Sequence, residues 1–168
     1  MRVYIPATFG MLKELSETGA VTARSGWGFA LTPALREFFI EGDDEDLSEI
    51  AFDDASRASL RLLAIGDETA FPHRRVVIST DVADSAVSLE SDMGESVVKL
   101  NPAAIQLQDV AAIHVDVESS ENATAAAIEA IDSADLGDED AELKVGDALD
   151  NFLAWYDPSE LNILVELL

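Results

Sequence analysis

Two arginines of this chain have the spacing that anion binding requires. Arg57 and Arg61 are four residues apart, so on a helix they project from one face, where two planar guanidinium groups can clamp a carboxylate or a phosphate. The alternative is that they pair with the many acidic side chains of this sequence, in exposed ion pairs worth about 0 to 1 kcal/mol each. The spacing therefore predicts either an anion-binding face or a solvated cluster of ion pairs.

A second small basic cluster, His73-Arg74-Arg75, stands at the entry to an apolar stretch. Arg74 and Arg75 are for this reason further candidates for binding an anion. The alternative interpretation is that they supply the charge with which an exposed strand edge avoids pairing with other chains.

His114 is the candidate acid or base. In the apolar stretch from Val110 to Val117, side chains of a strand alternate between two faces, so His114 shares its face with Ala112 and Asp116. A histidine beside a carboxylate can act as a general base. No serine stands in a recognisable nucleophile turn, however, and a solvated or buried, hydrogen-bonded histidine is the alternative.

The sequence gives no sign of a metal or cofactor site. The acidic segments that begin at Asp43, Asp132, Asp135 and Asp138 all lack the combination of alternating ligands, sixth-position glycine and closing glutamate that an EF-hand loop needs. Cysteine is absent, which excludes thiolate ligands and cysteine nucleophiles. Phosphate-loop and dinucleotide-binding glycine patterns are also missing. We therefore expect no metal and no cofactor, and lean against an enzyme.

Charge is distributed unevenly along the chain. All seven arginines lie at or before Arg75, and the only later cations are Lys99 and Lys144. Residues 1–75 hold eight bases and thirteen acids, whereas residues 76–168 hold two bases and twenty-one acids, within a total net charge of −24. Such a chain repels nucleic acid and anionic membranes. The charge instead favours a basic protein partner, oriented toward the acidic second part.

The first part of the chain reads as mainly helical. A short strand at Val3-Tyr4-Ile5 leads into a helix capped by Thr8, and a loop over residues 20–31 carries two large aromatic side chains. Thr32-Pro33 opens a second helix, in which Phe38 and Phe39 are expected to be buried. An acidic run over residues 43–46 then precedes a long helix that ends at Gly66, as the helix dipole favours.

The second part reads as β-rich after a break at residues 67–72. Strands are predicted over residues 75–82, 86–89, 96–100, 110–117 and 151–156, several of them close enough for antiparallel pairing. An alanine-rich helix follows Ser119 or Ser120, residues 132–142 look like an exposed acidic connector, and a terminal helix runs from Asp157-Pro158 to Leu168. Trp155 and Tyr156 occupy opposite faces of their strand, so one of them should enter the core.

These elements predict an α+β fold, with a mixed α/β fold as the alternative. We expect a helical N-terminal part packed on a largely antiparallel sheet from the second part, in one compact domain over residues 1–168. No apolar run approaches transmembrane length and the first residues lack a signal peptide, so a cytoplasmic location is expected.

Several segments also resemble an uncharacterised protein family of actinobacteria. The resemblance lies in the opening Met1-Arg2-Val3-Tyr4-Ile5-Pro6-Ala7-Thr8, the central Thr32-Pro33-Ala34-Leu35-Arg36-Glu37, Ala58-Ser59-Leu60-Arg61-Leu62-Leu63, Trp155-Tyr156 and the closing Glu166-Leu167-Leu168. It implies a stand-alone cytoplasmic domain and transfers no functional residue, because that family has no assigned activity.

Three functions follow as hypotheses. The first is a non-catalytic cytoplasmic interaction or accessory domain. The second is a small-anion binder or enzyme, for which Arg57, Arg61, Arg74, Arg75 and His114 should converge on one concave pocket. The third is self-association into a homodimer through the terminal helix or a strand edge, which repulsion between two chains of charge −24 opposes at low salt.

Overall fold

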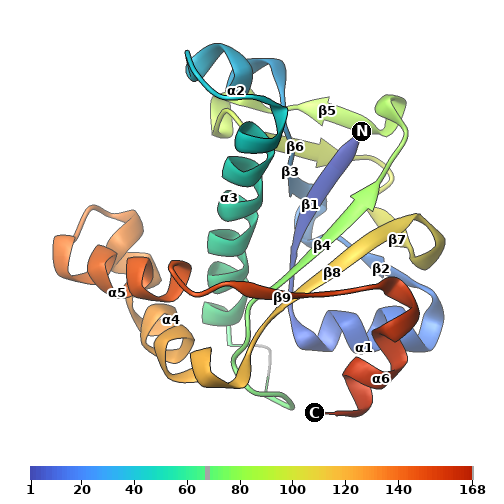
Figure 1. Ribbon diagram of the computed structural model, residues 1–168, viewed down its shortest axis with the longest axis vertical. Helices are drawn as coiled ribbons and strands as arrows, with labels where there is room; N and C mark the ends of the chain where they lie inside the picture. The colour runs from blue at the N-terminus through green and yellow to red at the C-terminus, as the bar shows by residue number, and fades with distance from the viewer. Residues whose placement is uncertain (67–68, 168) are drawn as a thin grey trace.

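The computed structural model describes residues 1–66 and 69–167 and has the predicted α+β architecture, with one seven-stranded antiparallel sheet in the order β5-β6-β3-β1-β4-β8-β9 (Figure 1). The strands are β1 (Arg2–Ala7), β3 (Trp27–Phe29), β4 (Val76–Asp81), β5 (Val87–Leu89), β6 (Val97–Leu100), β8 (Val110–Asp116) and β9 (Leu153–Tyr156), with β2 (Ala20–Thr22) and β7 (Ala104–Gln106) forming a separate pair. Asp67 of the predicted break and Leu168 of the predicted terminal helix lie outside the described residues.

Six helices accompany the sheet in the part of the chain that the structure describes. They are α1 (Phe9–Thr18), α2 (Pro33–Phe38), α3 (Asp44–Ala64), α4 (Glu121–Asp135), α5 (Glu139–Leu149) and α6 (Leu161–Glu166). The predicted starts of three helices are confirmed by side-chain hydrogen bonds: Thr8 caps α1, Thr32 caps α2, and Asp43 forms a reciprocal capping box with Asp46 at α3. At α4, Ser120 stands at the N-cap position as predicted, but its side chain makes no capping hydrogen bond.

The first part of the chain also contributes strands to the centre of the sheet. β1 pairs with β4 over its whole length, and β3 pairs with β1 and β6. The prediction of a loop over residues 20–31 was therefore wrong at both β2 and β3. Local sequence could not reveal these short strands, because their paired residues in β6 and β7 lie 68 to 86 positions further along the chain.

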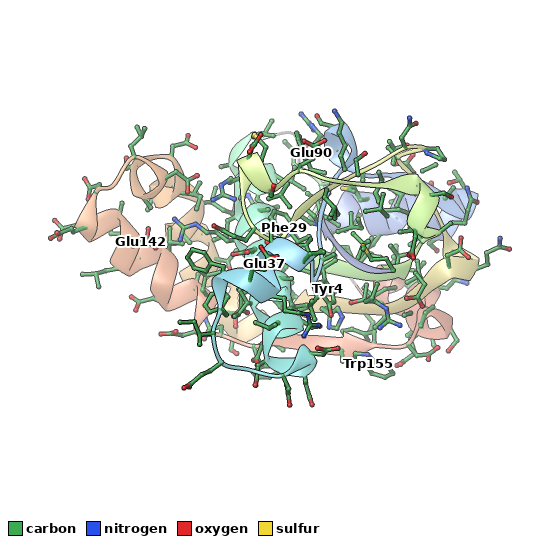
Figure 2. The ribbon with its side chains drawn as sticks, turned by 90° about the horizontal axis from the view of Figure 1, so that it is seen from above. Tyr4, Phe29, Glu37, Glu90, Glu142 and Trp155 are labelled. Atoms are coloured by element: carbon green, nitrogen blue, oxygen red, sulfur yellow. The ribbon has the colours of Figure 1, made fainter. Side chains whose placement is uncertain are left out.

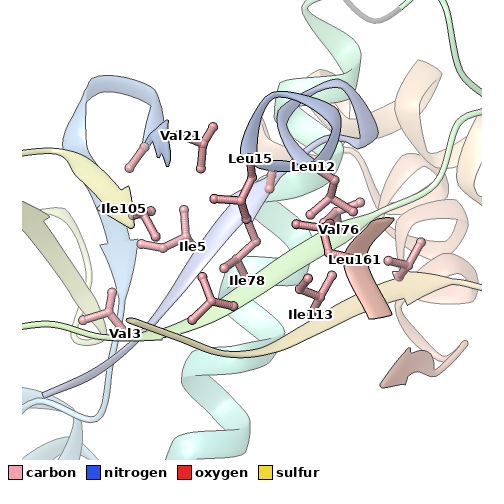
Figure 3. Close-up of a cluster of buried hydrophobic side chains, with 14 of the residues drawn as sticks. Val3, Ile5, Leu12, Leu15, Val21, Val76, Ile78, Ile105, Ile113 and Leu161 are labelled. Atoms are coloured by element: carbon pink, nitrogen blue, oxygen red, sulfur yellow. The ribbon is translucent and has the colours of Figure 1, made fainter. Parts of the chain in front are cut away.

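One face of the sheet carries the main core. Side chains of β1, β4 and β8, among them Ile5, Ile78 and Ile113, pack against Leu12 of α1 and Leu161 of α6 (Figure 3). The β2 and β7 pair closes the same core from the side with Val21 and Ile105. This face is apolar and buried, so it contributes mainly to stability.

The opposite face is crossed by α3. The Ser59 hydroxyl of α3 donates to the Ala7 carbonyl at 2.8 Å and accepts the Val76 amide at 3.1 Å, which fastens the helix to β1 and β4. α4 and α5 pack on the C-terminal half of α3 through a second cluster that includes Leu60, Ile131 and Val145, and they project to one side of the sheet (Figure 1).

Two further predictions were wrong. Phe38 is 63% exposed and Phe39 is 37% exposed, because α2 ends at Phe38 after one and a half turns and only Leu35 of its apolar residues is buried. The acidic connector over residues 132–142 is mostly helical, since α4 continues to Asp135 and α5 starts at Glu139. There the acidic residues of α5 occupy the first turn, where negative charge stabilises a helix.

Candidate functional site

Two hollows lie on the α3 face of the sheet, one on each side of the helix. Positions 49, 52, 53 and 56 of α3 border the first hollow, and positions 58, 61 and 62 border the second. At 3.6 residues per turn, these two sets point roughly half a turn apart. A single helix therefore separates two surfaces with different side chains.

We call the first hollow, between α3 and β9, the acidic hollow. It encloses about 600 Å³. Its lining residues come from α3, the residue before β4, β8, and the stretch from the end of α5 to the start of β9: Glu49, Phe52, Asp53, Ser56, Arg75, His114, Leu149, Asp150, Asn151, Phe152 and Leu153.

Arg75 forms the floor of the acidic hollow together with Asp116. Both side chains are buried, and the guanidinium donates from Nε at 2.9 Å and from Nη2 at 2.7 Å to the two carboxylate oxygens. Arg75 also donates to Ser56 Oγ and to the Asn151 carbonyl, and Thr124 donates to Asp116. The charge of Arg75 is thus neutralised inside the floor and is not offered to an anion.

His114 lines the hollow as a neutral imidazole. Its Nε2 lies 2.9 Å from Ser79 Oγ, and its ring meets Phe52 edge to face with centroids 4.7 Å apart. Burial, with a smaller contribution from the charge of Arg2, lowers the pKa of His114 to about 4. Asp116 accepts from Arg75 and Thr124 rather than from His114, so the predicted pairing of histidine and carboxylate is absent from the described hydrogen bonds.

Ser79 and His114 are residue types that can serve as nucleophile and base, but a substrate in the hollow could not reach the Ser79 hydroxyl. Ser79 is 2% exposed and does not line the hollow. A histidine with a pKa near 4 is also a weak base at neutral pH, where catalytic bases are tuned closer to 7. Sequence reasoning missed Ser79, although the alternation along β4 places it on the same side as Val77, toward α3.

The carboxylates of the hollow crowd one another. Burial raises the pKa of Asp53, and the nearby charges of Glu49 and Asp54 raise it further, while Arg75 acts in the opposite direction. Asp150 adds a third carboxylate at the far wall. Among the described residues, no group of three or more His, Cys, Asp or Glu side chains is arranged to hold a metal ion.

The other candidate arginines lie elsewhere. Arg57 donates to Glu142 at 2.7 Å and to Asp135 at 3.2 Å, and Arg61 donates to both oxygens of Asp135 at 2.7 and 3.0 Å. These arginines lower the pKa of Asp135 and of Glu142. The structure thus places Arg57 and Arg61 in ion pairs that join α3 to α4 and α5.

Arg74 is likewise paired, with Glu121 at 2.8 Å. Only Arg75 and His114 among the five sequence candidates line the acidic hollow, and Arg61 lines the second hollow instead. The five side chains do not share one pocket.

We call the second hollow the arginine groove. It encloses about 410 Å³ between α3 and the strands β1, β3 and β6, and its lining is mostly apolar. The lining residues are Pro6, Arg24, Trp27, Phe29, Ala58, Arg61, Leu62, Met93 and Val97. Sequence reasoning noted the two aromatics but not that Arg61 joins them, because residues 27 and 61 are brought together only by the packing of α3 on β3.

The two tryptophans of the chain lie near different hollows. Trp27 lines the arginine groove, whereas Trp155 lies opposite His114 in the register of β8 and β9, on the side of the acidic hollow. As predicted, Trp155 and Tyr156 face opposite ways: Tyr156 packs on the core and Trp155 is 59% exposed. Figure 2 labels Phe29 of the groove and Trp155 in different parts of the view.

Comparison with known proteins gives a family but no activity. The chain belongs to a family of unknown function (DUF6912), whose model matches residues 1–165. No curated protein and no solved structure shows significant similarity to the chain. In the described part of the chain, every helix is too short or too polar to cross a membrane.

Proposed function

We propose that this member of a family of unknown function is a non-catalytic interaction domain that binds a basic segment of a partner protein. The observation that carries the proposal is the acidic hollow, where Glu49, Asp53 and Asp150 surround a space of about 600 Å³ that also exposes the rings of Phe52 and Phe152. A guanidinium or ammonium group gains from carboxylates and from aromatic faces together.

The electrostatics of the hollow favour this occupant. The one arginine of the lining is held by Asp116, so the three rim carboxylates have no cation among the other lining residues. The raised pKa of Asp53 reflects burial and the repulsion of neighbouring carboxylates, and the attraction of a bound cation offsets both.

Strand β9 offers the partner a backbone to pair with. It is an edge strand whose one strand partner in the described sheet is β8, and its residues Leu153–Tyr156 carry no charge. Phe152, just before β9, is 71% exposed, and Trp155, within β9, is 59% exposed. Edge strands that avoid pairing use charged side chains or proline, which β9 lacks, so an extended segment can add to it.

A basic partner suits this edge better than a second copy of the chain. Two copies would bring together net charges of −24 each, with Asp150 and Asp157 flanking the paired strands. We place the interaction in the cytoplasm of an actinobacterium on the strength of the residue resemblance. The neutral His114 and the buried Ser79 support a binding role over a catalytic one.

The test uses Trp155 as the reporter in a Trp27→Phe variant. An extended peptide of alternating valine and arginine is titrated at 150 mM salt, and the same peptide with glutamine in place of arginine serves as the uncharged probe. We expect saturable binding of the arginine peptide, at least tenfold tighter than the glutamine peptide, with slower amide exchange along β9.

Two double variants show whether the peptide binds at the acidic hollow or is attracted by the negative charge of the protein as a whole. Glu49→Gln with Asp53→Asn should weaken binding at least tenfold. Glu139→Gln with Asp140→Asn, which removes the same charge from the exposed start of α5, should change it less than twofold. Equal weakening by both pairs, or no binding at either 50 or 150 mM salt, would overturn the proposal.

A further inference from the structure

We infer that the arginine groove is a second, independent site, which binds a small aromatic anion such as an aryl carboxylate. It lies on the opposite side of α3 from the acidic hollow and shares none of its lining residues. The inference does not depend on the proposed function.

The groove has the character of a small-molecule site. Trp27, Phe29, Leu62 and Met93 give it an apolar interior, and its volume of about 410 Å³ falls in the range of roughly 300 to 1,000 Å³ that small-molecule sites occupy. Met93 is 67% exposed at the border of the groove, and methionine adapts its shape to a ligand readily. An aromatic ring is the occupant that such walls bury best.

Among the described residues that line the groove, the charged ones are all cationic. Arg24 and Arg61 line it, and no aspartate or glutamate is among the lining residues. Lys99 lies next to it on β6, with its Nζ 5.1 Å from the centroid of the Trp27 ring. Three of the ten Lys and Arg residues in this very acidic chain therefore surround one tryptophan.

The two acids that pair with Arg57 and Arg61 are already engaged. Asp135 accepts from Arg57 and Arg61, and Glu142 accepts from Arg57, so these four side chains form a cluster without net charge. Arg61 uses Nε and Nη2 for its bonds to Asp135, and among the described residues 1–66 and 69–167 its Nη1 group has no hydrogen-bond partner. Asp54 accepts from Ser96 at 2.6 Å, and burial raises its pKa.

This arrangement selects against both neutral and cationic ligands. An uncharged apolar molecule gains only contact with the apolar walls. An anion also gains a hydrogen bond from the guanidinium of Arg61, which can donate from Nη1 to a second charged partner. A cation would meet Arg24, Arg61 and Lys99. The expected ligand is thus one or two aromatic rings with a single carboxylate or sulfonate.

The experiment uses Trp27 as a local reporter. A Trp155→Phe variant leaves Trp27 as the sole tryptophan, and the probe is 1-anilinonaphthalene-8-sulfonate, whose neutral analogue N-phenyl-1-naphthylamine lacks the sulfonate. We expect saturable energy transfer from Trp27 to the sulfonate probe, with binding at least fivefold tighter than that of the neutral analogue.

Two matched arginine variants test the role of the charge. Arg61→Gln should weaken the sulfonate probe at least fivefold and the neutral analogue less than twofold. Arg57→Gln also breaks a bond to Asp135 but does not line the groove, so it should change neither probe by more than twofold. Circular dichroism of each variant confirms that the probe reports on the folded protein.

Three results would overturn the inference: equal affinity for the two probes, equal effects of Arg57→Gln and Arg61→Gln, or equal energy transfer from Trp155 in the Trp27→Phe variant. Because the proposed function is read from Trp155 with a basic peptide, either proposal can fail while the other holds.

Discussion

The acidic hollow and the arginine groove share one helix and one face of one sheet, yet they carry opposite charge. Glu49 and Asp53 of α3 border the hollow, and Arg61 of the same helix borders the groove. The helical period alone sends these residues to opposite sides of α3. A chain with a net charge of −24 can thus still gather Arg24, Arg61 and Lys99 at one groove, because the helix directs Arg61 away from the acids of the hollow.

The two regions also differ in what holds them. The floor of the acidic hollow depends on the buried pair of Arg75 and Asp116, whereas the groove depends on close packing of β3 against β1. Gly28 permits that packing, since a side chain there would bring its Cβ to 2.7 Å from Val3 Cγ1. Hydrogen bonds between charged groups hold the acidic hollow in place, and close backbone packing holds the arginine groove in place.

The largest effect is expected from Arg75→Ala. Removing the guanidinium leaves the Asp116 carboxylate buried without its charged partner, which should lower the free energy of unfolding by about 3 to 5 kcal/mol. Urea unfolding followed by far-UV circular dichroism measures this. Arg74→Ala, which breaks the less buried pair with Glu121, is the control and should cost about 1 kcal/mol. Similar losses of stability in the two variants would show that the buried pair of Arg75 and Asp116 is no more important than the more exposed pair of Arg74 and Glu121.

The second effect is a pH dependence at His114. Its pKa is lowered to about 4 in the folded protein and is about 6.5 in the unfolded chain, so below pH 6.5 the unfolded state binds the extra proton. Stability should therefore fall as the pH drops from 6.5 to 4, by on the order of 3 kcal/mol from this residue.

The His114→Gln variant isolates that contribution. Urea unfolding of both proteins between pH 4 and 7.5 should show the advantage of the wild type shrinking by about this amount toward low pH. Asp53 and Asp54, whose pKa values are raised, change stability in the opposite sense but do so in both proteins. A difference that stays constant with pH would mean that His114 titrates normally.

The third effect sharpens the account of the groove. Gly28→Ala places a methyl group against Val3 and Ile5, which we expect to cost about 1 to 3 kcal/mol through overpacking and to weaken binding of the sulfonate probe. Gly146→Ala in α5 meets no atom within 4 Å and should instead stabilise the protein by about 0.5 to 1 kcal/mol. Thermal unfolding compares the two, and a neutral Gly28→Ala would contradict the tight contact of β3 with β1.

The smallest effect concerns the ion pairs beside the groove. Arg57→Ala should lower stability by about 1 kcal/mol or less at low salt, because its bonds to Glu142 and Asp135 are partly exposed. The loss should shrink in 1 M sodium chloride, where exposed charges are screened. A loss that persists at high salt would indicate that α4 and α5 depend on Arg57 for packing rather than for charge.

The local features of this fold could be predicted from the sequence because their causes are local. Thr8, Thr32 and Asp43 cap helices through hydrogen bonds to residues three positions away. The helical repeat of apolar residues in α3 and the alternation of side chains in β8 also depend only on neighbours within a few positions. The short strand β3 and the exposure of Phe38 were missed, because each depends on what packs beside it.

The candidate site divides in the same way. The sequence identified Arg75 and His114 as groups with chemical potential, but it placed them with Arg57, Arg61 and Arg74, which the fold sends elsewhere. It gave no reason to single out Glu49, Phe52 and Asp53, which read as an ordinary solvated helix face.

By itself the sequence determined the charge, the starts of α1, α2 and α3, the antiparallel β-rich second part and the absence of cysteine chemistry, since these follow from composition and from neighbours within a few residues. Only the tertiary structure decided which arginine meets which acid. Arg75 and Asp116 are 41 positions apart, and Arg57 and Glu142 are 85 apart. A charge interacts with whatever the folded chain brings within a few ångströms, and sequence distance does not encode that proximity.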